Sequence, residues 1–310
     1  MGMKTRTSTT TAEYEEYRTR LNNWGRWGAD DQLGTLNHIT PQGRAAAAAL
    51  VRDGRSVSCA NPLATRAVLP DERRNGRPAD HRMNVGPGSS SDYIGVSYHG
   101  FVNTHIDALC HIFTGPGGQL YNGRPSDLVT EDGARSNSVD FWRDGIVTRG
   151  VLYDIPRFRG HEHVREGEPV EGWDLEDCAK HVGVTPQAGD AVLVRSGYTP
   201  FWAANPTFEL AFPPNTPGVG VSALEFLYDT NAALLGWDLQ EASNQQQYGE
   251  RIPVHSIAIP HMGLPLLDNA NFERLAEVCA ETGRYEFFLV VAPLVVEGGT
   301  GSPVNPIATF

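Results

Sequence analysis

Residues 97–113, SYHGFVNTHIDALCHIF, place three histidines and an aspartate within thirteen residues, with no lysine, arginine or glutamate among them. An extended chain turns successive side chains to opposite faces, so a strand over residues 97–107 would present every second side chain on one face. That face would carry His99, Phe101, Asn103, His105 and Asp107. We therefore predict that the polar chemistry of this stretch gathers on one side of a strand.

The pair His105 and Asp107 has the spacing of two ligands to one metal ion. On a strand their Cα atoms would lie about 6 to 7 Å apart, so both side chains can reach an ion at bond distances near about 2 Å. Neutral imidazole and carboxylate groups suit Zn, Mn and Fe(II) alike. His111, four residues beyond Asp107, could turn back as a general acid or base with a pKa suited to neutral pH. A single histidine is more often a hydrogen-bonded structural residue, but a cluster of three beside an aspartate favours a site.

The bulk composition limits the other function classes. The chain has 310 residues, is 40% hydrophobic and carries a formal net charge of -12. Nucleic acids and anionic membrane surfaces are disfavoured as partners, because both need clustered Lys and Arg. The N-terminal stretch lacks the apolar segment of a signal peptide, and the longest apolar run, residues 287–296, is too short to span a bilayer. We expect a cytoplasmic protein that acts on a small molecule.

The four cysteines are scattered without a CxxC pair, which predicts reduced, buried thiols rather than a disulfide framework or a zinc ribbon. Helical and strand-like segments alternate along the chain with long irregular connections between them. This pattern predicts one α/β domain with a mixed β-sheet. Residues 1–22 are expected to form a flexible or partner-wrapping arm, and residues 23–310 the catalytic domain.

Capping residues, glycines and β-rich runs give the expected elements. Helices are predicted over residues 41–53, 174–183 and 269–283, and from Ser222, where Ser222 and Glu225 fit the pattern of a capping box. Strands are predicted over residues 145–155, 191–197, 233–238 and 287–296. Residues 70–91 are rich in Arg, Asp, Gly, Pro and Ser, which is typical of a long surface loop, and such loops are often functional.

The motif HGFVNTHIDALCH, residues 99–111, resembles the hallmark HGxTGTHxDxPxH of the putative cyclase or metal-dependent formamidase family. This family includes bacterial kynurenine formamidase and isatin hydrolase. The match covers the three histidines, Gly100, Thr104 and Asp107. The segments GRWGADDQLGTLNHITP, PVHSIAIPHMGLPLLDN and GGTGSPVNPIA also look like parts of its longer members, so the resemblance covers most of the chain. It implies a swivelling β/β/α type of fold and a homo-oligomer.

The resemblance implies a hydrolase acting on carbon–nitrogen bonds other than peptide bonds. Such an enzyme would cleave a cyclic amide or an N-formyl amide with metal-activated water, and the expected ion is Zn or Mn. Carried over to this chain, His105 and Asp107 would be metal ligands and His111 the catalytic acid/base. His255 and Asp268 would form a downstream pair. Asp268 stands where the formamidases have a glutamate, and its shorter reach disfavours a second ion.

Phe101 departs from the family pattern, because the formamidases place a further histidine ligand there. With that ligand lost, His255 becomes the expected third ligand. His99 shares the predicted face, but its Cα would lie roughly 13 Å from that of Asp107 along a strand. We therefore assign His99 and Phe101 to substrate contact, and Phe101 and Trp202 favour a planar or apolar substrate.

The same departure leaves a second function open. A metal-poor or metal-free cyclase, dehydratase or lactonase could use His99, His111 and Asp268 for acid–base chemistry. A binding protein without turnover is the weakest alternative, since the proton-transfer residue His111 is retained.

Overall fold

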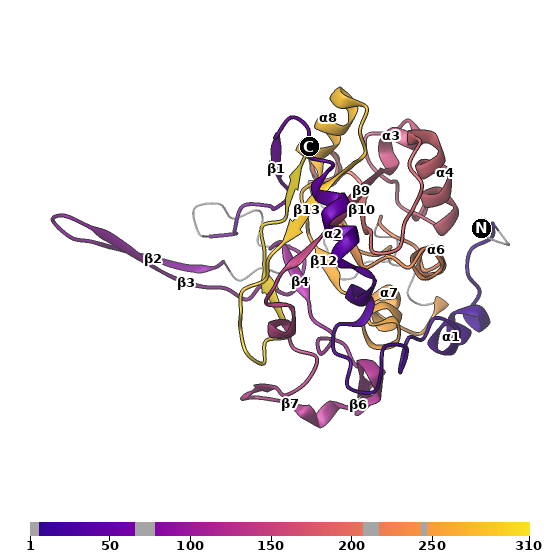
Figure 1. The fold of residues 1–310 in the computed structure, drawn as a ribbon, viewed down its shortest axis with the longest axis horizontal. Helices are drawn as coiled ribbons and strands as arrows, with labels where there is room; N and C mark the ends of the chain where they lie inside the picture. Colours follow the sequence, from indigo (N-terminus) through magenta and orange to yellow (C-terminus); the bar gives the residue numbers. More distant parts are fainter. Residues whose placement is uncertain (1–5, 66–77, 207–216, 243–246) are drawn as a thin grey trace.

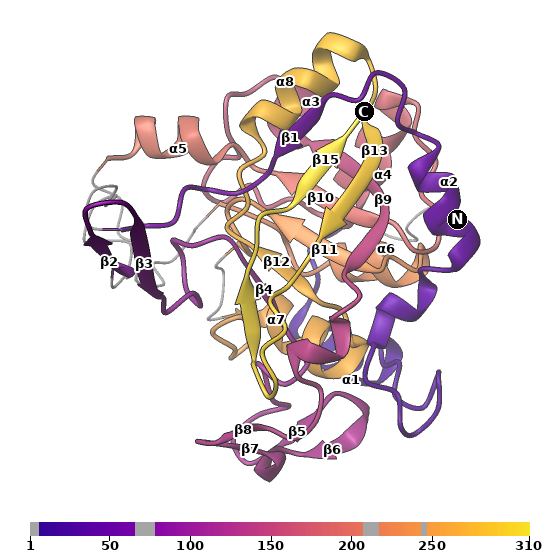
Figure 2. The ribbon, with the colours of Figure 1, turned by 60° about the vertical axis from the view of Figure 1, so that its left-hand side comes forward.

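The fold is built on one large mixed sheet with helices packed around it. The computed structural model describes residues 6–65, 78–206, 217–242 and 247–310. Nine strands form a twisted sheet in the order β1-β15-β13-β9-β10-β11-β12-β4-β14 (Figures 1 and 2). The central four strands run parallel. They are β9 (Ile146–Asp154), β10 (Ala191–Arg195), β11 (Leu234–Trp237) and β12 (Leu266–Asp268).

Antiparallel strands extend this parallel centre on both sides. They are β1 (Ser56–Ser58), β4 (His105–Asp107), β13 (Glu286–Val291), β14 (Gly301–Pro303) and β15 (Ile307–Thr309). Short two-stranded pairs lie outside the sheet. They are β5 (Gln119–Leu120) with β6 (Arg124–Pro125), and β7 (Val129–Thr130) with β8 (Gly133–Ala134).

Helices connect the parallel strands and cover the sheet (Figure 1). The α-helices are α1 (Thr11–Arg20), α2 (Pro41–Ala48), α3 (Ile155–Arg159), α4 (Gly172–Val182), α5 (Tyr198–Ala204), α6 (Ala223–Asp229), α7 (Pro253–Ile257) and α8 (Glu273–Thr282). Because helices cover the parallel strands, β10 and β11 are almost wholly buried, which explains their continuous apolar sequences. None of the helices in the described ranges has the length and apolar character needed to cross a membrane.

The predicted α/β class with a mixed sheet is confirmed, and most predicted elements are present. Helix α2 begins at Pro41 as expected, with the Thr40 side chain capping Gly43 N–H, but it ends at Ala48. The prediction of a capping box at Ser222 is wrong, because the Ser222 side chain accepts no hydrogen bond from the first turn of α6. The Ser222 hydroxyl instead donates to Glu171, at the start of α4, and ties the two helices together. All four cysteines are free and buried, as predicted.

Two irregular regions differ from their predictions. The expected surface loop over residues 70–91 contains a regular hairpin in its described part, β2 (Asp80–Val85) paired with β3 (Ser90–Gly95). Residues 70–77 lie outside the described residues. The expected strand over residues 97–107 is wrong for its first eight residues, because only β4 is extended and residues 97–104 form a loop.

The described residues of the expected N-terminal arm form a helix that packs against the rest of the same chain. Helix α1 opens with a capping box between Thr10 and Glu13, and it buries Tyr14 and Tyr17. The Tyr14 hydroxyl donates to the carbonyl of Pro253, the first residue of α7. The segment thus packs beside a helix that carries a candidate site residue, and a role in wrapping a partner stays a prediction.

Candidate metal centre

Strand β4 brings the central residues of the site together through its register. It is only three residues long, fully buried and hydrogen-bonded on both edges, to β12 and to β14. His105 and Asp107 share one face of this strand by its period of two. Across the antiparallel pair, His105 lies opposite Asp268 of β12, and directly opposed residues share a face. The sheet therefore places His105, Asp107 and Asp268 side by side.

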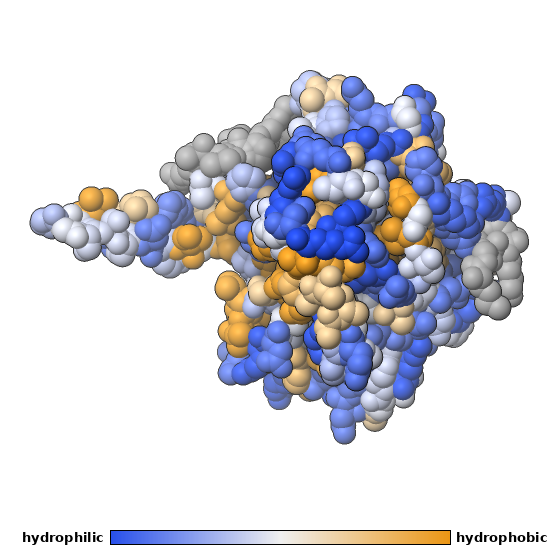
Figure 3. Space-filling model, turned by 45° about the horizontal axis from the view of Figure 1, so that its top comes forward, coloured by the Kyte–Doolittle hydropathy of each residue, from blue (hydrophilic) through white to orange (hydrophobic). Residues whose placement is uncertain are grey.

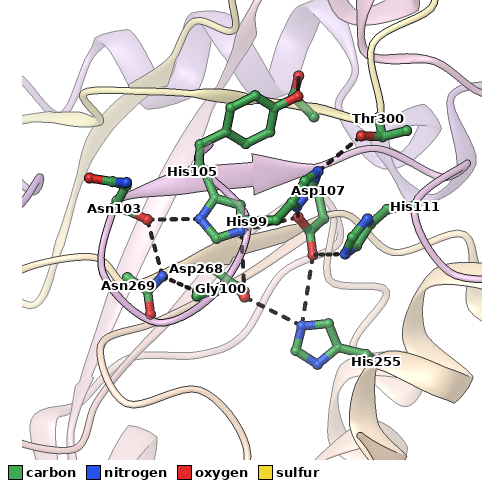
Figure 4. Close-up of polar contacts among 12 residues, drawn as sticks. His99, Gly100, Asn103, His105, Asp107, His111, His255, Asp268, Asn269 and Thr300 are labelled. Carbon is green, nitrogen blue, oxygen red and sulfur yellow. Dashed lines mark hydrogen bonds and ion pairs between the residues drawn. The ribbon is translucent and has the colours of Figure 1, made fainter. Parts of the chain in front are cut away.

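The Asp107 carboxylate is the centre of the cluster (Figure 4). Its side chain is 1% exposed, and neither of its oxygens accepts a hydrogen bond from a described residue. Four imidazole nitrogens nevertheless lie close to it. The distances are 3.0 Å from His99 Nδ1 and 3.3 Å from His105 Nε2 to Oδ1, and 3.7 Å from His255 Nε2 and 3.8 Å from His111 Nε2 to Oδ2.

His105 and His255 both turn Nε2 toward the centre because their other nitrogen is fixed. The Nδ1 atom of His105 lies 2.8 Å from the carbonyl oxygen of Asn103, and a carbonyl can only accept, so this Nδ1 carries the proton. The Nδ1 atom of His255 is hydrogen-bonded to the Glu241 carboxylate. The same carboxylate accepts the Val254 N–H at the start of α7. Both imidazoles therefore turn Nε2 inward, where each offers a lone pair when its ring is neutral.

Asp268 is oriented in the same way. The indole Nε1 of Trp237 donates to its Oδ1 at 2.6 Å, which leaves Oδ2 facing the two histidines. That oxygen lies 3.3 Å from His255 Nε2 and 3.9 Å from His105 Nε2. A hydrogen bond from an outer residue that fixes each donor is the usual arrangement around protein-bound metals.

The donor set fits a divalent cation. When both imidazoles are neutral, their inward lone pairs face two carboxylates, and this arrangement is unfavourable unless positive charge lies between them. Ligands about 2.1 Å from a tetrahedral ion lie about 3.4 Å from one another, close to the spacings seen here. Donor atoms of His105, Asp107 and Asp268 all lie within 4.8 Å of one another, as do those of His99, Asp107 and His111. Nitrogen and oxygen donors of this kind suit Zn, Mn or Fe(II).

The charge preferences of the buried groups show that the carboxylates favour positive charge between them, as a proton or as a cation. Burial alone would raise the pKa of Asp107, but the surrounding histidines hold it well below its usual range. Burial alone would lower the pKa of His255, but Glu241 and Asp268 raise it well above its usual value. Burial also acts against charge on His105, and Asp107 outweighs it, so the His105 pKa is raised.

His99 and His111 form the open side of the centre. Their rings stack with centroids 3.8 Å apart and planes within 2°. Their side chains are 28% and 26% exposed, whereas the other site residues are nearly inaccessible. Thr300 fixes the outer His99 nitrogen, with its Oγ1 3.0 Å from Nε2. Burial lowers the pKa of His111 to about 4, which outweighs the opposing effect of Asp107, so the prediction of a His111 pKa suited to neutral pH is wrong for this structure. A substrate would therefore approach from the stacked pair.

His99 reaches Asp107 because the preceding loop folds back over β4. Gly100 has a φ of +116°, a conformation that favours glycine. Its carbonyl accepts hydrogen bonds from the side chains of Asn269 and Gln240. Opposite Asp107 on β14 stands Gly301, where an added Cβ would collide with the Ile106 carbonyl and lie 3.1 Å from His99 Cε1. The prediction that His99 lies too far from Asp107 is therefore wrong.

Phe101 points to a different environment from His99. It packs against a small apolar cluster formed by Phe201, Trp202 and Leu239, together with Tyr198. Leu239 lies two residues before Glu241, and Phe101 lies two residues after His99, so the chain links the cluster to the centre at both places. The loop that starts α5 is held in place by Asp238, whose carboxylate accepts the N–H groups of residues 196–198.

The structure brings together all six polar residues that the sequence singled out. They are His99, His105, Asp107, His111, His255 and Asp268. Sequence reasoning missed the outer residues that orient them, above all Glu241, Trp237 and Asn269. For Glu241 the available signal was a carboxylate shortly after the buried strand β11.

Comparisons with known proteins agree with this architecture. A family model described as "Putative cyclase" matches residues 62–242. The crystal structure of a novel cyclase superposes with a TM-score of 0.82 at 29% sequence identity, covering 94% of this chain and 99% of that one. No curated protein sequence matches the chain.

Two isatin hydrolases are similar in fold. One, solved with the product analogue thioisatinate, has a TM-score of 0.58 at 17% identity, covering 88% of this chain and 97% of that one. Isatin hydrolase A from Labrenzia aggregata, solved with benzyl benzoate, has a TM-score of 0.60 at 21% identity, covering 88% and 98%. At these identities the likeness concerns the fold.

Proposed function

The chain belongs to the putative cyclase family, and from this premise we propose that it is a metal-dependent hydrolase that cleaves an amide bond of a small molecule. The proposed bond is that of a cyclic amide or an N-formyl amide. The observation that carries the proposal is the buried Asp107 carboxylate, which has no hydrogen-bond partner among the described residues although four imidazole nitrogens surround it.

Four buried donors would hold the ion. We assign His105 Nε2, His255 Nε2 and Asp107 as ligands, as the sequence predicted, and Asp268 as a further donor. Asp268 was first a candidate for acid–base work, but its Oδ2 faces the two buried histidines and its Oδ1 is held by Trp237. A bound divalent ion would polarise a carbonyl group and lower the pKa of a water molecule.

The open side of the centre would handle the proton and the substrate. His111 presents Nε2 3.8 Å from Asp107 and is half-buried, so it can reach both the centre and a bound molecule. We propose that it takes a proton from the attacking water and passes it to the leaving nitrogen. His99, fixed by Thr300, holds the His111 ring in plane by stacking.

The apolar cluster beside the site supports a substrate with an aromatic or apolar part. Phe101, Tyr198, Phe201 and Trp202 would contact that part while the amide lies at the histidine pair. A small-molecule substrate, a cytoplasmic location and the choice between Zn and Mn stay predictions.

The metal-free alternative loses its main motivation in this geometry. It rested on Phe101, which removes a ligand found in the formamidases, but His255 and Asp268 bring further donors to the centre from α7 and β12. It also required His99, His111 and Asp268 to act together, whereas Asp268 faces His255 and His105.

The proposal is tested by stripping and restoring the metal. Protein purified without an affinity metal is dialysed against a chelator, reconstituted with Zn or Mn, and assayed on a panel of cyclic amides and N-formyl amides. We expect no hydrolysis from the stripped protein and recovery with one of the ions. Full activity after exhaustive chelation would contradict the proposal and redirect the search to lactones and dehydration substrates.

A further inference from the structure

Two polar residues with left-handed backbone conformations lie just beyond the ends of neighbouring strands at the metal centre. Asn269 follows β12 directly and has a φ of +51°, and Gln240 comes three residues after β11 with a φ of +44°. Both residues are buried, with exposed fractions of 2% and 8%. A positive φ is uncommon for residues other than glycine, and residues held in this way cluster at functional sites. The two side chains therefore call for a functional explanation.

The Asn269 amide holds the loop that precedes β4. Its Nδ2 donates to the carbonyl oxygens of Gly100, at 2.6 Å, and of Asn103, at 3.1 Å (Figure 4). Its Oδ1 accepts a hydrogen bond from Gln240 Nε2 at 3.1 Å. The same Gln240 nitrogen lies 3.0 Å from the Gly100 oxygen, so two amides hold one carbonyl.

Each of the two carbonyls leads to a different side of the metal centre. The Asn103 carbonyl also accepts the hydrogen bond from Nδ1 of His105, which turns Nε2 of that ring inward. The Gly100 carbonyl belongs to the residue next to His99, whose ring stacks on His111. One amide group therefore supports a ligand on the buried side and the stacked pair on the open side.

The loop over residues 97–104 gains little support from the chain before it. Strand β3 ends at Gly95, and the β2–β3 hairpin extends away from the body of the molecule (Figures 1 and 3). All six residues of β2, and five of the six in β3, are exposed. At the other end of the loop, the Thr104 hydroxyl donates to the Asn269 carbonyl at 2.6 Å. Backbone and side chain of Asn269 thus both hold this loop.

We propose that Asn269 is a positioning residue that couples the two sides of the metal centre. Through the Asn103 carbonyl it fixes the His105 ring and thereby the affinity for the ion. Through the Gly100 carbonyl it fixes the stacked pair and thereby turnover. An asparagine suits this position, because its amide offers two N–H donors to two carbonyls and an oxygen to Gln240, and it tolerates a positive φ. The coupling rests on the metal-dependent hydrolysis proposed above.

Asn269→Gly removes the amide without straining the backbone, because glycine readily adopts a φ of +51°. We expect the affinity for Zn or Mn, measured by competition with a chelator, to weaken by about 10-fold. At saturating metal, kcat on the best amide of the substrate panel should also fall by about 10-fold. An Asn269→Gly protein that keeps either the metal affinity or the kcat of the wild type would overturn the coupling.

Asn231→Gly is the matched control. Asn231 also has a positive φ, +53°, but it lies between α6 and β11, at the opposite end of β11 from Gln240. This variant gains the same backbone freedom and should match the wild type in metal affinity and kcat. Losses equal to those of Asn269→Gly would assign the effect to backbone freedom and overturn the proposal.

A second comparison separates positioning from a general loss of structure. In a His99→Ala background the route to the open side is already broken, so adding Asn269→Gly should lower kcat by less than about twofold. The same addition should still weaken metal affinity by about 10-fold, because the route through Asn103 and His105 remains. An equal loss of kcat with and without His99 would show that Asn269 does not act through this histidine.

Hydrogen–deuterium exchange on the metal-free protein distinguishes this proposal from the proposed hydrolysis. The backbone amides of residues 97–104 should exchange about fivefold faster in Asn269→Gly than in the wild type, as for the loss of one hydrogen bond. Asn231→Gly should leave their exchange unchanged. A wild type that binds no ion would contradict the hydrolysis, whereas wild-type exchange in this loop of Asn269→Gly would overturn the positioning role.

Discussion

The two sides of the Asp107 centre differ in how their histidines are held. On the buried side, His105 and His255 each have Nδ1 fixed by a carbonyl or carboxylate group and turn Nε2 inward. On the open side, His99 and His111 are held mainly by stacking on one another, and about a quarter of each side chain is exposed. The difference supports our proposal that the buried side holds an ion and the open side exchanges protons with a bound molecule.

The largest expected effect comes from Asp107→Asn, which keeps the shape of the residue and removes its charge. Both sides of the centre meet at this carboxylate, so we expect both metal binding and turnover to be lost. Activity with added Zn or Mn should fall by more than about 100-fold, beyond the loss typical of an outer-residue change. Steady-state assays measure the loss, and an unchanged circular dichroism spectrum shows that the variant is folded.

Replacing His111 should separate the two sides. His111→Gln removes the proposed proton carrier on the open side and leaves the four buried donors intact. Turnover should fall by about 10² to 10⁴-fold, while the metal content stays that of the wild type. Loss of the metal together with activity would instead place His111 among the ligands.

Glu241→Gln probes the support of the buried side. The amide keeps a hydrogen-bond acceptor for the Val254 N–H but removes the charge beside His255. We expect metal affinity to weaken by about 10 to 100-fold, as for other outer residues around metal sites. Competition with a chromogenic chelator measures the affinity. Glu286→Gln is the matched control. Glu286 lies on β13, away from the centre, and its carboxylate pairs with Arg149 of β9, so this variant should bind metal normally.

Removing the ion should lower thermal stability, because a ligand that binds only the folded state stabilises it. At free metal about 100 times Kd the contribution is about 2.7 kcal/mol. For a chain of this size that corresponds to a drop in Tm of roughly 5 °C on chelation. Thermal scans with and without chelator test this, and Asp107→Asn should show no such drop. An equal drop in that variant would mean that the chelator acts elsewhere.

The smallest effect is expected at Thr300→Val, which removes only the hydroxyl bonded to His99. A neutral hydrogen bond contributes about 1 kcal/mol, so turnover should fall by roughly fivefold with metal content unchanged. A loss as large as that of His111→Gln would show that His99 acts directly on the substrate.

The central site residues and the buried strands could be predicted because their sequence signals involve residues that are close together in the chain. The HxDxxxH spacing identified His105, Asp107 and His111, and the apolar runs of β9, β10 and β11 predicted buried strands. A strand period of two suffices to place His105 and Asp107 on one face. The family resemblance added His255 and Asp268, which no local pattern connects to β4.

The features that could not be predicted depend mainly on contacts between residues far apart in the sequence. The loop over residues 97–104 reads as a strand by alternation, but hydrogen bonds from Asn269 and Gln240 to Gly100 fold it back. Glu241 meets His255 only through the register of β11 with β12 and the position of α7. The pairing of β2 with β3 was hidden by a composition rich in Ser, Asp and Gly, which is typical of loops.

The central claim is that the buried side of the centre binds one divalent ion, and metal content per chain tests it most directly. Elemental mass spectrometry would be run on the wild type, Asp107→Asn and His111→Gln, each reconstituted with Zn or Mn and then desalted. We predict about one ion per chain in the wild type and in His111→Gln, and none in Asp107→Asn. A folded wild type that retains no metal, or an Asp107→Asn variant that retains as much as the wild type, would contradict the account.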